Sequence, residues 1–371
     1  MTPNERLLAV FQGKQPDVIP WHADLTYWYN AQRVWDRLPE AWRGDGVRRM
    51  YTDLRAGCHE HALFNPWRQE FEGTETTVET YEEGGVQLQR TQWHTPVGSL
   101  TQIKQYEPQA ATWAYRKYPV AGQEDLRTLR WMYEHLKVTP NFGPEEEALE
   151  FWKDWGLPSS VPPRSPMAHL IVIWAGVTNT SYALADCPEE VERTLWRMHE
   201  AEDPIYEACA QAPAPLVYFG ENITGEVVSP SLFDRYYRPF YAQRVPQLHA
   251  AGKFIFVHVD GAFRNILKPL AATGVDCAQS LTPAPVGDVP VSEMRQVAGP
   301  DLILWGGVPA AFFSPLYPEQ ALIDIVLECL RRYKHDGKFM LCVCDQVPPD
   351  GVIERVRLVS ELVEEHGVLD R

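Results

Sequence analysis

The chain has 371 residues, of which 45% are hydrophobic and 23% are charged. This composition is typical of a folded globular protein and excludes a disordered chain or a fibre. The 34 basic and 50 acidic side chains give a formal net charge of −16. A chain this acidic is poorly suited to a nucleic-acid backbone or an anionic membrane surface, so neither is expected as a partner.

No apolar run in the sequence approaches the roughly 20 residues that cross a membrane. The opening segment, MTPNERLLAVFQGKQP, lacks the long apolar core of a secretory signal. The seven cysteines are few and odd in number, which argues against a disulfide framework. These features predict a reduced, cytoplasmic setting.

The N-terminal half has an irregular pattern. A helix is expected over residues 3–13 with Thr2 as its N-cap, and a short strand over 17–21 follows it. Two alternating runs flank Gly84 and Gly85, which predicts a β-hairpin inserted over residues 70–106. The proline-rich segment LPSSVPPRSP is expected to be a connector.

From residue 167 onward, apolar runs alternate with amphipathic ones. The expected strands cover 169–174, 216–220, 254–258, 276–280, 302–305 and 339–344. The expected helices begin at 186 and cover 229–252, 263–272, 290–298, 318–335 and 350–366. This alternation predicts parallel βα units. The fold expected is therefore α/β, a (β/α)8 TIM barrel with an inserted β-hairpin and helical region in its N-terminal half, and one barrel strand has no match in the sequence.

Polar residues stand where the apolar strands end. In a parallel barrel the carboxyl ends of the strands form one mouth, where active sites lie. The residues at these ends are Glu221, Asn222, His258, Asp260, Gln279, Ser280, Trp305, Cys344 and Asp345. Their recurrence on successive strands predicts a functional site at the mouth.

His258 and Asp260 are two residues apart on one strand, so their side chains share a face. Cys344 ends a later strand, and Glu221 ends an earlier one. Imidazole, carboxylate and thiolate are all zinc ligands, so these four residues are a candidate metal site. The alternative is that His258 only forms hydrogen bonds in the pocket and that Asp260 caps a loop.

The residues after the first strand are a second candidate region. His22 and Asp24 are potential polar anchors, and Tyr27 and Trp28 a potential aromatic wall, although the same pattern fits the start of an amphipathic helix. The ligand-rich run 58–61 is expected to be a solvated helix end. The sequence has no G-x-S-x-G, GxGxxG or GxxxxGK[ST] motif, which argues against a serine hydrolase and a nucleotide-binding loop.

Several segments resemble the uroporphyrinogen decarboxylase superfamily. They are NERLLAVFQGKQPDVIP, ENITGEVVSPSLFDRYYRPFYAQRVPQLHAAGKFIFVHVDGAFRNILKPLAATGVD, LILWGGVP and FMLCVCDQVPPDG. The resemblance implies a (β/α)8 barrel with an aromatic cleft at its strand ends. It also implies a single domain over residues 1–371, with 70–106 as a β-hairpin insertion, and it makes a homodimer an expectation.

Two branches of that superfamily are relevant. True decarboxylases carry an arginine-rich segment after the first strand, whereas this chain reads WHADLTYWYN and lacks the arginines. The corrinoid- and thiol-linked methyltransferases bind zinc through a His-x-Cys pair and a later Cys. His258 matches the histidine and Cys344 the later cysteine, but Asp260 stands where the first cysteine is expected.

The resemblance therefore implies a metal-dependent methyltransferase that moves a methyl group between a small methylated substrate or a thiol and a corrinoid. The corrinoid is expected on a partner protein, because the chain has no D-x-H-x-x-G segment. His258, Asp260 and Glu221 are the expected catalytic residues, and zinc is expected on His258, Asp260, Cys344 and Glu221. The residues expected to bind substrate are His22, Asp24, Tyr27, Trp28, Asn222, Gln279 and Trp305.

Two alternatives stay open. The first is a metal-free decarboxylase or lyase of a small acid other than uroporphyrinogen, with His258 as general acid oriented by Asp260 or Glu221. Its candidate carboxylate clamps are Arg164, Arg235 and Arg264. The second is a non-catalytic module that holds a small ligand or a corrinoid partner.

Overall fold

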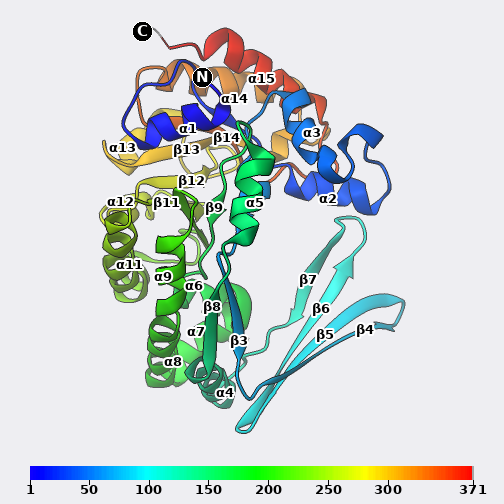
Figure 1. The fold of residues 1–371 in the computed structure, drawn as a ribbon, viewed down its shortest axis with the longest axis vertical. Coiled ribbons are helices and arrows are strands. Elements are labelled where there is room, and N and C mark those ends of the chain that lie inside the picture. The colour runs from blue at the N-terminus through cyan, green and yellow to red at the C-terminus, as the bar shows by residue number, and fades with distance from the viewer. Residues whose placement is uncertain (370–371) are drawn as a thin grey trace. The chain divides into compact units, whose positions relative to one another are not determined.

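The central sheet of the computed structural model, which describes residues 1–369, is curved and parallel (Figure 1). Its strands follow the order β1-β14-β13-β12-β11-β10-β9-β2. They are β1 (Trp21–His22), β2 (Leu63–Phe64), β9 (Ser159–Ser160), β10 (Leu216–Ile223), β11 (Phe254–Val259), β12 (Cys277–Leu281), β13 (Ile303–Pro309) and β14 (Phe339–Cys344). Two isolated parallel bridges, His22 to Gly57 and Cys58 to Gly156, join the two ends of the sheet. The sheet is thus closed as a barrel, which confirms the predicted fold.

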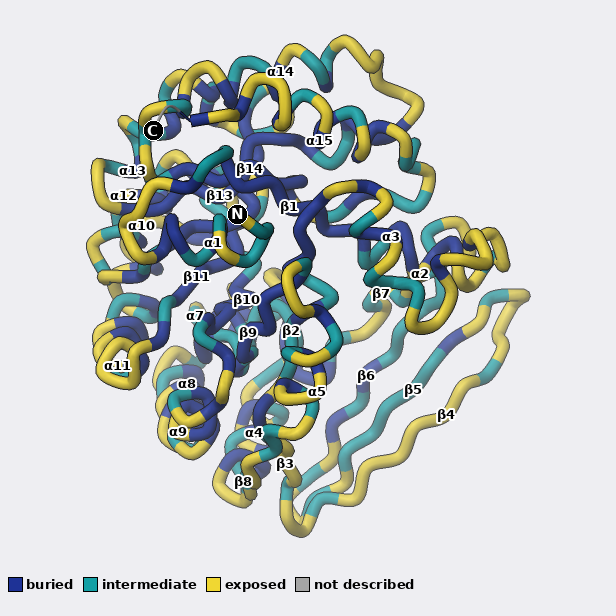
Figure 2. Tube along the Cα trace, turned by 45° about the horizontal axis from the view of Figure 1, so that its top comes forward, coloured by how far each residue is buried: buried dark blue, intermediate teal, exposed yellow. Residues whose placement is uncertain are grey.

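The interior of the barrel is filled by apolar side chains. One cluster of buried residues contains Leu216, Tyr218, Phe256, Trp305 and Cys342, which project inward from four strands. Phe11 of the first helix packs against Trp305, with ring centroids 6.5 Å apart. This interior supports the residues at the strand ends, and the strands appear as the most buried part of the chain in Figure 2.

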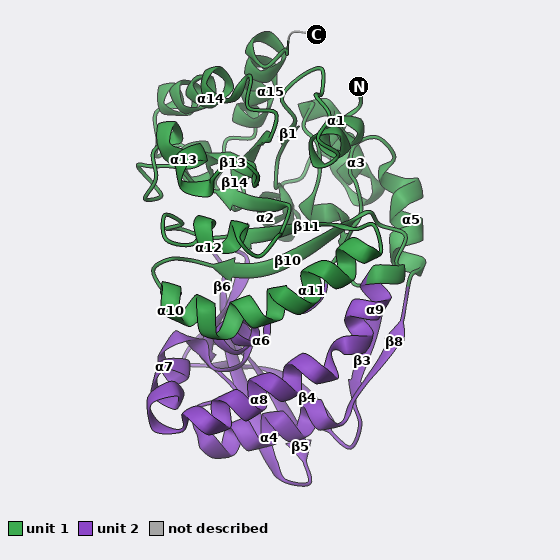
Figure 3. Cartoon of the chain, turned by 90° about the vertical axis from the view of Figure 1, so that its left-hand side faces the viewer, with its two compact units in different colours: residues 1–65, 142–161, 210–371 green, residues 66–141, 162–209 purple. Residues whose placement is uncertain are grey.

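The chain divides into two compact units (Figure 3). Unit 1 contains residues 1–65, 142–161 and 210–371, with the barrel strands. Its helices are α1 (Pro3–Phe11), α2 (Thr26–Val34), α3 (Val47–Leu54), α5 (Gly143–Trp152), α10 (Pro230–Leu232), α11 (Arg238–Ala250), α12 (Leu267–Ala271), α13 (Met294–Ala298), α14 (Glu319–Tyr333) and α15 (Glu354–His366). The first of these begins as predicted, because Thr2 and Glu5 form a reciprocal capping box at its N-terminus.

Unit 2 contains residues 66–141 and 162–209. It has an antiparallel pair, β3 (Trp67–Phe71) with β8 (Leu136–Pro140), and an antiparallel sheet of β4 (Glu75–Glu83), β5 (Val86–Thr95), β6 (Gly98–Glu107) and β7 (Thr112–Lys117). Its helices are α4 (Gln123–Glu134), α6 (Pro166–His169), α7 (Gly176–Asp186), α8 (Pro188–Ala201) and most of α9 (Asp203–Gln211). The pairing of β4 with β5 around Gly84 and Gly85 confirms the predicted hairpin. The single domain and the 70–106 boundaries stay a prediction.

Two expectations about individual elements were wrong. Residues 169–174 are not a strand: α6 and a π-helical turn, Leu170–Trp174, cover them, because Pro166 follows Ser165 and favours a helix start. Two barrel strands, β2 and β9, therefore have no match among the expected strands, and β9 lies inside the expected connector. Its two serines carry no apolar pattern, and Ser160 instead donates a hydrogen bond to Glu145 Oε1 at 2.7 Å. Within residues 1–369, no helix has the length and apolar character that spanning a membrane requires.

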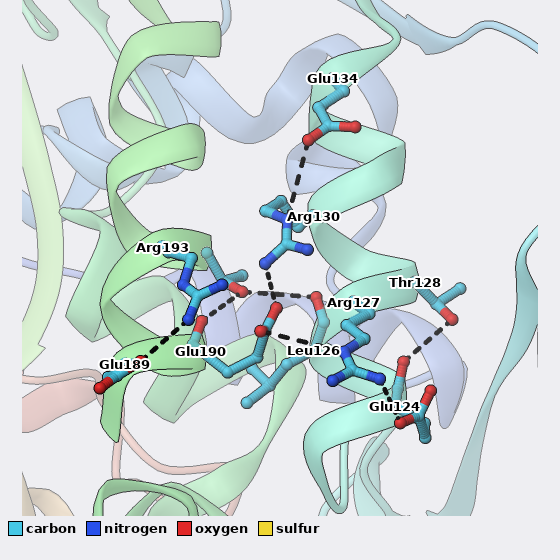
Figure 4. Close-up of polar contacts among 10 residues, drawn as sticks. Glu124, Leu126, Arg127, Thr128, Arg130, Glu134, Glu189, Glu190 and Arg193 are labelled. Atoms are coloured by element: carbon cyan, nitrogen blue, oxygen red, sulfur yellow. Dashed lines mark hydrogen bonds and ion pairs between the residues drawn. The ribbon is translucent and has the colours of Figure 1, made fainter. Parts of the chain in front are cut away.

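A buried ion pair joins α4 to α8 in unit 2 (Figure 4). Arg130 contacts the carboxylate of Glu190, whose side chain is only 5% exposed. We expect Arg130→Ala to lower the free energy of unfolding by about 3 kcal/mol, because the buried carboxylate of Glu190 loses the positive charge of Arg130. Urea denaturation followed by circular dichroism measures this loss.

The matched control is Arg193→Ala on α8. Arg193 contacts Glu189 at 3.0 Å, but the two side chains are 61% and 86% exposed. An exposed pair contributes little, so a change within about 0.5 kcal/mol is expected. Equal losses for the two variants would contradict a stabilising role of burial at the α4–α8 contact.

Candidate active site

His258, at the end of β11, is the centre of the candidate site. Its Nε2 lies 3.0 Å from Asp260 Oδ1, and Asp260 Oδ2 accepts a hydrogen bond of 2.7 Å from Asn222 Nδ2. One ligand-type atom from each of His258, Asp260 and Asp345 lies within 4.8 Å of the other two. We call these three residues the His258 set. They come from the ends of β11 and β14, as the barrel geometry predicts.

Gln279 of β12 holds the other side of the His258 ring. Its Oε1 lies 2.6 Å from His258 Nδ1, and its Nε2 lies 3.1 Å from Nε2 of His59. His59, Gln279 and His258 are all buried. One amide therefore connects two histidines that are distant in sequence and fixes the orientation of both rings.

The charges around His258 favour a cation. Burial lowers the pKa of His258, but the Asp260 carboxylate, Glu60 and Gln279 outweigh burial and raise the pKa to about 10. Burial raises the pKa of Asp345, and the neighbouring Asp260 and Glu60 raise it further, while His258 opposes them. The carboxylates are therefore close enough to repel each other, and a positive charge among them relieves that repulsion.

A second group of ligand-type side chains lies on the other side of Gln279. One atom from each of Asp24, His59 and Glu60 lies within 4.8 Å of the other two, and we call these residues the Asp24 set. His59 Nε2 is 3.2 Å from Glu60 Oε1. Burial raises the pKa of Asp24 well above its usual range, and the Glu60 carboxylate adds to this effect. The two sets act on each other, since Glu60 also contributes to the raised pKa of His258.

The expectation that residues 58–61 form a solvated helix end was wrong. His59 is 1% exposed, because Gly57 and Cys58 form the bridges that close the barrel. Gly57 is required at this position, since a Cβ there would lie 2.5 Å from the ring of His22. A bridge this short leaves no apolar run in the sequence, so the strand and its polar end were both missed.

Three strand ends at the site have a left-handed backbone. Asn222 near the end of β10, Ser280 in β12 and Asp345 after β14 have φ values of 51°, 71° and 67°. Such a conformation costs a non-glycine residue about 1–3 kcal/mol and is concentrated at functional sites. The Ser280 hydroxyl accepts a 2.7 Å hydrogen bond from the Asp345 backbone N–H and stabilises the turn that places Asp345.

A pocket of about 430 Å³ opens beside the His258 set. Its lining residues are Asn222, Asp260, Gly261, Thr282, Val286, Ala310, Ala311, Cys344 and Asp345. These residues, all in the described part of the chain, include no lysine or arginine. The pocket is therefore better suited to a neutral or cationic group than to a carboxylate.

Two of the expected metal ligands lie outside both sets, as judged over the described residues. Cys344 is in the wall of the pocket, but its Sγ accepts a hydrogen bond from Gly307 N–H at 3.1 Å and lies 3.0 Å from the Leu281 carbonyl, to which the thiol donates. Glu221 is buried in β10, and its charge adds to the burial that raises the pKa of Tyr237. Their roles as ligands stay a prediction.

The residues expected to bind substrate occupy different positions. Asn222, Gln279 and Asp24 contact or belong to the two sets. Tyr27 is close to Asp345, since burial and the Asp345 charge raise the pKa of its hydroxyl. Trp28 instead belongs to the packing of α2, where its indole N–H donates to the Gly351 carbonyl at 3.0 Å. Tyr27 is therefore an aromatic side chain close enough to the site for the charge of Asp345 to affect its hydroxyl.

His22 and Trp305 lie deeper in the barrel. Their ring centroids are 5.3 Å apart, and those of His59 and Trp305 are 4.9 Å apart. Burial, with smaller contributions from His59 and Arg6, lowers the pKa of His22 to about 3, so His22 is neutral. Trp305 is fully buried, and the imidazole rings of His22 and His59 both pack against it.

Asp345, His59 and Glu60 are the site residues that sequence reasoning did not assign. The signal for Asp345 was its place directly after an apolar strand, next to Cys344. No comparable signal existed for His59 and Glu60, because the strand before them consists of isolated bridges.

Comparison with known proteins extends these observations. A solved structure of a methyltransferase from Methanosarcina mazei is similar in fold, with a TM-score of 0.61 and 14% sequence identity over 98% of this chain and 99% of that one. No curated protein sequence matches the chain. The sequence profile of the uroporphyrinogen decarboxylase (URO-D) family matches residues 165–366, more than half of the chain. The protein therefore belongs to the uroporphyrinogen decarboxylase (URO-D) family.

Proposed function

We propose that the protein is a metal-dependent methyltransferase that moves a methyl group between a small methylated substrate or a thiol and a corrinoid carried by a partner protein. The observation that carries the proposal is the His258 set at the edge of a pocket without lysine or arginine in its lining. The fold shared with a methyltransferase is in accord with it. Zinc and the corrinoid are parts of the proposal.

The residues of the His258 set fit a divalent metal. With Nδ1–H of His258 donating to Gln279 Oε1, Nε2 keeps its lone pair for a ligand. The hydrogen bond from Asn222 fixes Asp260, and the hydrogen bond that the Asp345 backbone N–H donates to the Ser280 hydroxyl fixes the turn at Asp345. Zinc bound to such a set acts as a Lewis acid, which lowers the pKa of a bound thiol or polarises the heteroatom that carries the methyl group.

The ligands of this set are nitrogen and oxygen atoms, which make a harder site than thiolates. Asp260 stands where the related methyltransferases were expected to have cysteine, and Asp345 adds a second carboxylate. A harder site favours an oxygen- or nitrogen-bound methyl donor. We therefore propose a methoxy compound or a methylamine as the donor in preference to a thioether.

The pocket argues against the decarboxylase alternative. Its Asp260 and Asp345 carboxylates repel a carboxylate substrate at short range. Of the expected carboxylate clamps, Arg264 is engaged by Glu293 at 2.9 Å and by the Asp288 carbonyl. The decarboxylase reading thus lacks a demonstrated anion-binding group in the pocket.

The test is an assay of zinc-loaded protein with cob(I)alamin as methyl acceptor and a panel of methanol, methoxyarenes and methylamines. In each case the electron pair of cobalt(I) forms the Co–C bond as the C–X bond breaks. X leaves with the electron pair of the broken C–X bond and takes up a proton. Methylcobalamin formation above the protein-free blank that a chelator abolishes is the expected result. No transfer from any donor, together with carbon dioxide release from a carboxylic acid by metal-free protein, would contradict the proposal.

Variants at Asp345 and Cys344 distinguish two ligand assignments: the carboxylate of the His258 set and the cysteine that the resemblance implies. We expect Asp345→Asn to lower the rate of methyl transfer about 100-fold, because the amide replaces a charged ligand. Cys344→Ser, which keeps a donor for the Leu281 carbonyl, is expected to stay within about threefold of the wild type. A larger loss for Cys344→Ser than for Asp345→Asn in the same assay would assign the ligand role to the thiol.

A further inference from the structure

The antiparallel sheet of unit 2, β4 to β7, has no role in the proposed function, and its two faces differ in charge (Figure 1). Residues that pair across antiparallel strands share a face, and so do residues two apart on one strand. One face carries four carboxylates, those of Glu75, Glu79, Glu83 and Glu107. The opposite face carries Lys104 and, within these four strands, the single carboxylate of Glu82.

Two cations of this sheet lie over tyrosine rings, one on each face. Arg90 Cζ lies 4.8 Å from the centroid of the Tyr81 ring, and a guanidinium nitrogen lies 3.4 Å from a carboxylate oxygen of Glu79. Lys104 Nζ also lies 4.8 Å from a ring centroid, that of Tyr115, but no carboxylate pairs with it among residues 1–369. The first cation thus has an anionic partner within the sheet, and the second leaves that place to a ligand.

Tyr115 is the centre of the groups around Lys104. The Tyr118 ring stacks on it, with centroids 4.3 Å apart, and Gly176 leaves room for this stack, since a Cβ there would lie 2.6 Å from the Tyr118 ring. Burial, with a smaller contribution from Tyr118, raises the pKa of Tyr115, while the positive charge of Arg164 opposes the rise. The Tyr115 hydroxyl therefore stays protonated at neutral pH, and both Lys104 and Arg164 are close to this side chain.

Aromatic surface continues along the same face. Tyr106 follows Lys104 by two residues, and Trp113 precedes Tyr115 by two, so the four side chains share one face. The rings of Tyr106 and Trp113 have centroids 5.2 Å apart, and both residues are half-buried. We call Lys104, Tyr106, Trp113 and Tyr115 the Lys104 face. It combines a cation without a carboxylate partner with ring surface on which another aromatic ring can pack.

We propose that the Lys104 face binds a small aromatic carboxylate, whose charge pairs with the Lys104 ammonium and whose ring packs against Trp113 and Tyr106. Charge complementarity favours this occupant, because the acidic side chains of the sheet lie mainly on the other face and the chain as a whole carries a net charge of −16. The site is in unit 2 and does not depend on the metal site of the proposed function.

Isothermal titration calorimetry of the full chain with 2-naphthoate tests the site. Wild type is expected to bind one equivalent, and to bind 2-naphthalenemethanol, which has the same ring and no charge, about 10-fold more weakly. Lys104→Met is expected to weaken naphthoate binding about 10-fold, whereas Lys104→Arg keeps the charge and is expected to stay within about threefold of the wild type. Trp113→Ala is expected to weaken binding about fivefold through the lost ring contact.

Arg90→Met is the matched control. It removes a cation at the same distance from a tyrosine ring, but from the opposite face, and is expected to bind naphthoate within about twofold of the wild type. No binding to wild type up to about 10 mM naphthoate, or equal affinity for the neutral analogue, would overturn the proposal without the need for a variant. An unchanged affinity of Lys104→Met, or equal losses in Lys104→Met and Arg90→Met, would also overturn it.

Discussion

His258→Ala is expected to lower the rate of methyl transfer about 1000-fold, the loss typical when a group that acts directly on the reacting atoms is removed. The substitution removes the imidazole from the His258 set. It also leaves Asp260 and Asp345 without the positive or metal-bound partner that offsets their repulsion. The initial rate of methylcobalamin formation, with zinc and the best donor of the panel at saturation, measures the effect.

His249→Ala is the matched control for this substitution. His249 also contacts an aspartate, Asp276, at 2.9 Å, but the pair lies on α11 and directly before β12, outside the pocket lining. The rate of this variant is expected to equal that of the wild type within about twofold. A His258→Ala rate above about one-tenth of the wild-type rate would show that His258 is not at the reacting centre.

Trp305→Ala is expected to lower the free energy of unfolding by about 4 kcal/mol, as large aromatic truncations in a packed core do. Trp305 is 0% exposed, and its ring packs on Phe256 with centroids 5.3 Å apart. The rings of His22 and His59 also pack on Trp305, so the substitution leaves a cavity beside these two histidines. Chemical denaturation followed by circular dichroism measures the loss.

Trp196→Ala provides the comparison for a tryptophan outside the core. Trp196 lies on α8 and is 61% exposed, so its removal is expected to change the free energy of unfolding by no more than about 0.5 kcal/mol. A loss below about 1 kcal/mol for Trp305→Ala would mean that the barrel interior relaxes around the missing ring.

The second half of the barrel could be predicted from the sequence because its strands are continuous apolar runs. The strand that carries His258 is buried from its second residue onward, the strand that ends at Cys344 is buried along its whole length, and a helix follows each of them. Burial on both faces produces the apolar pattern. The polar residue after such a run is then recognisable as a strand end, which is how His258 and Asp260 were found.

The first half could not be predicted in the same way. Gly57 and Cys58 contribute only single bridges, and β9 consists of two serines that are held by hydrogen bonds to neighbouring strands and to Glu145. Neither has an apolar pattern. The positions of His59 and Glu60 follow from these short strands, so their place in the site became evident only from the closed barrel.

Asp345 was recognised as a strand-end residue but received no role, for a different reason. Cys344 has the residue type that the resemblance requires, and it lies in the pocket wall. The left-handed turn after β14, with a φ of 67° at Asp345, brings the next side chain toward His258 instead. This backbone conformation places the Asp345 carboxylate near His258, and no pattern in the sequence reports it.

The most direct test of the account is a crystal structure of the zinc-loaded protein with data collected at the zinc absorption edge. The account predicts an anomalous peak about 2.0–2.2 Å from His258 Nε2 and from oxygens of Asp260 and Asp345. A peak about 2.3 Å from Cys344 Sγ with both carboxylates unbound would contradict it, as would the lack of any peak beside His258.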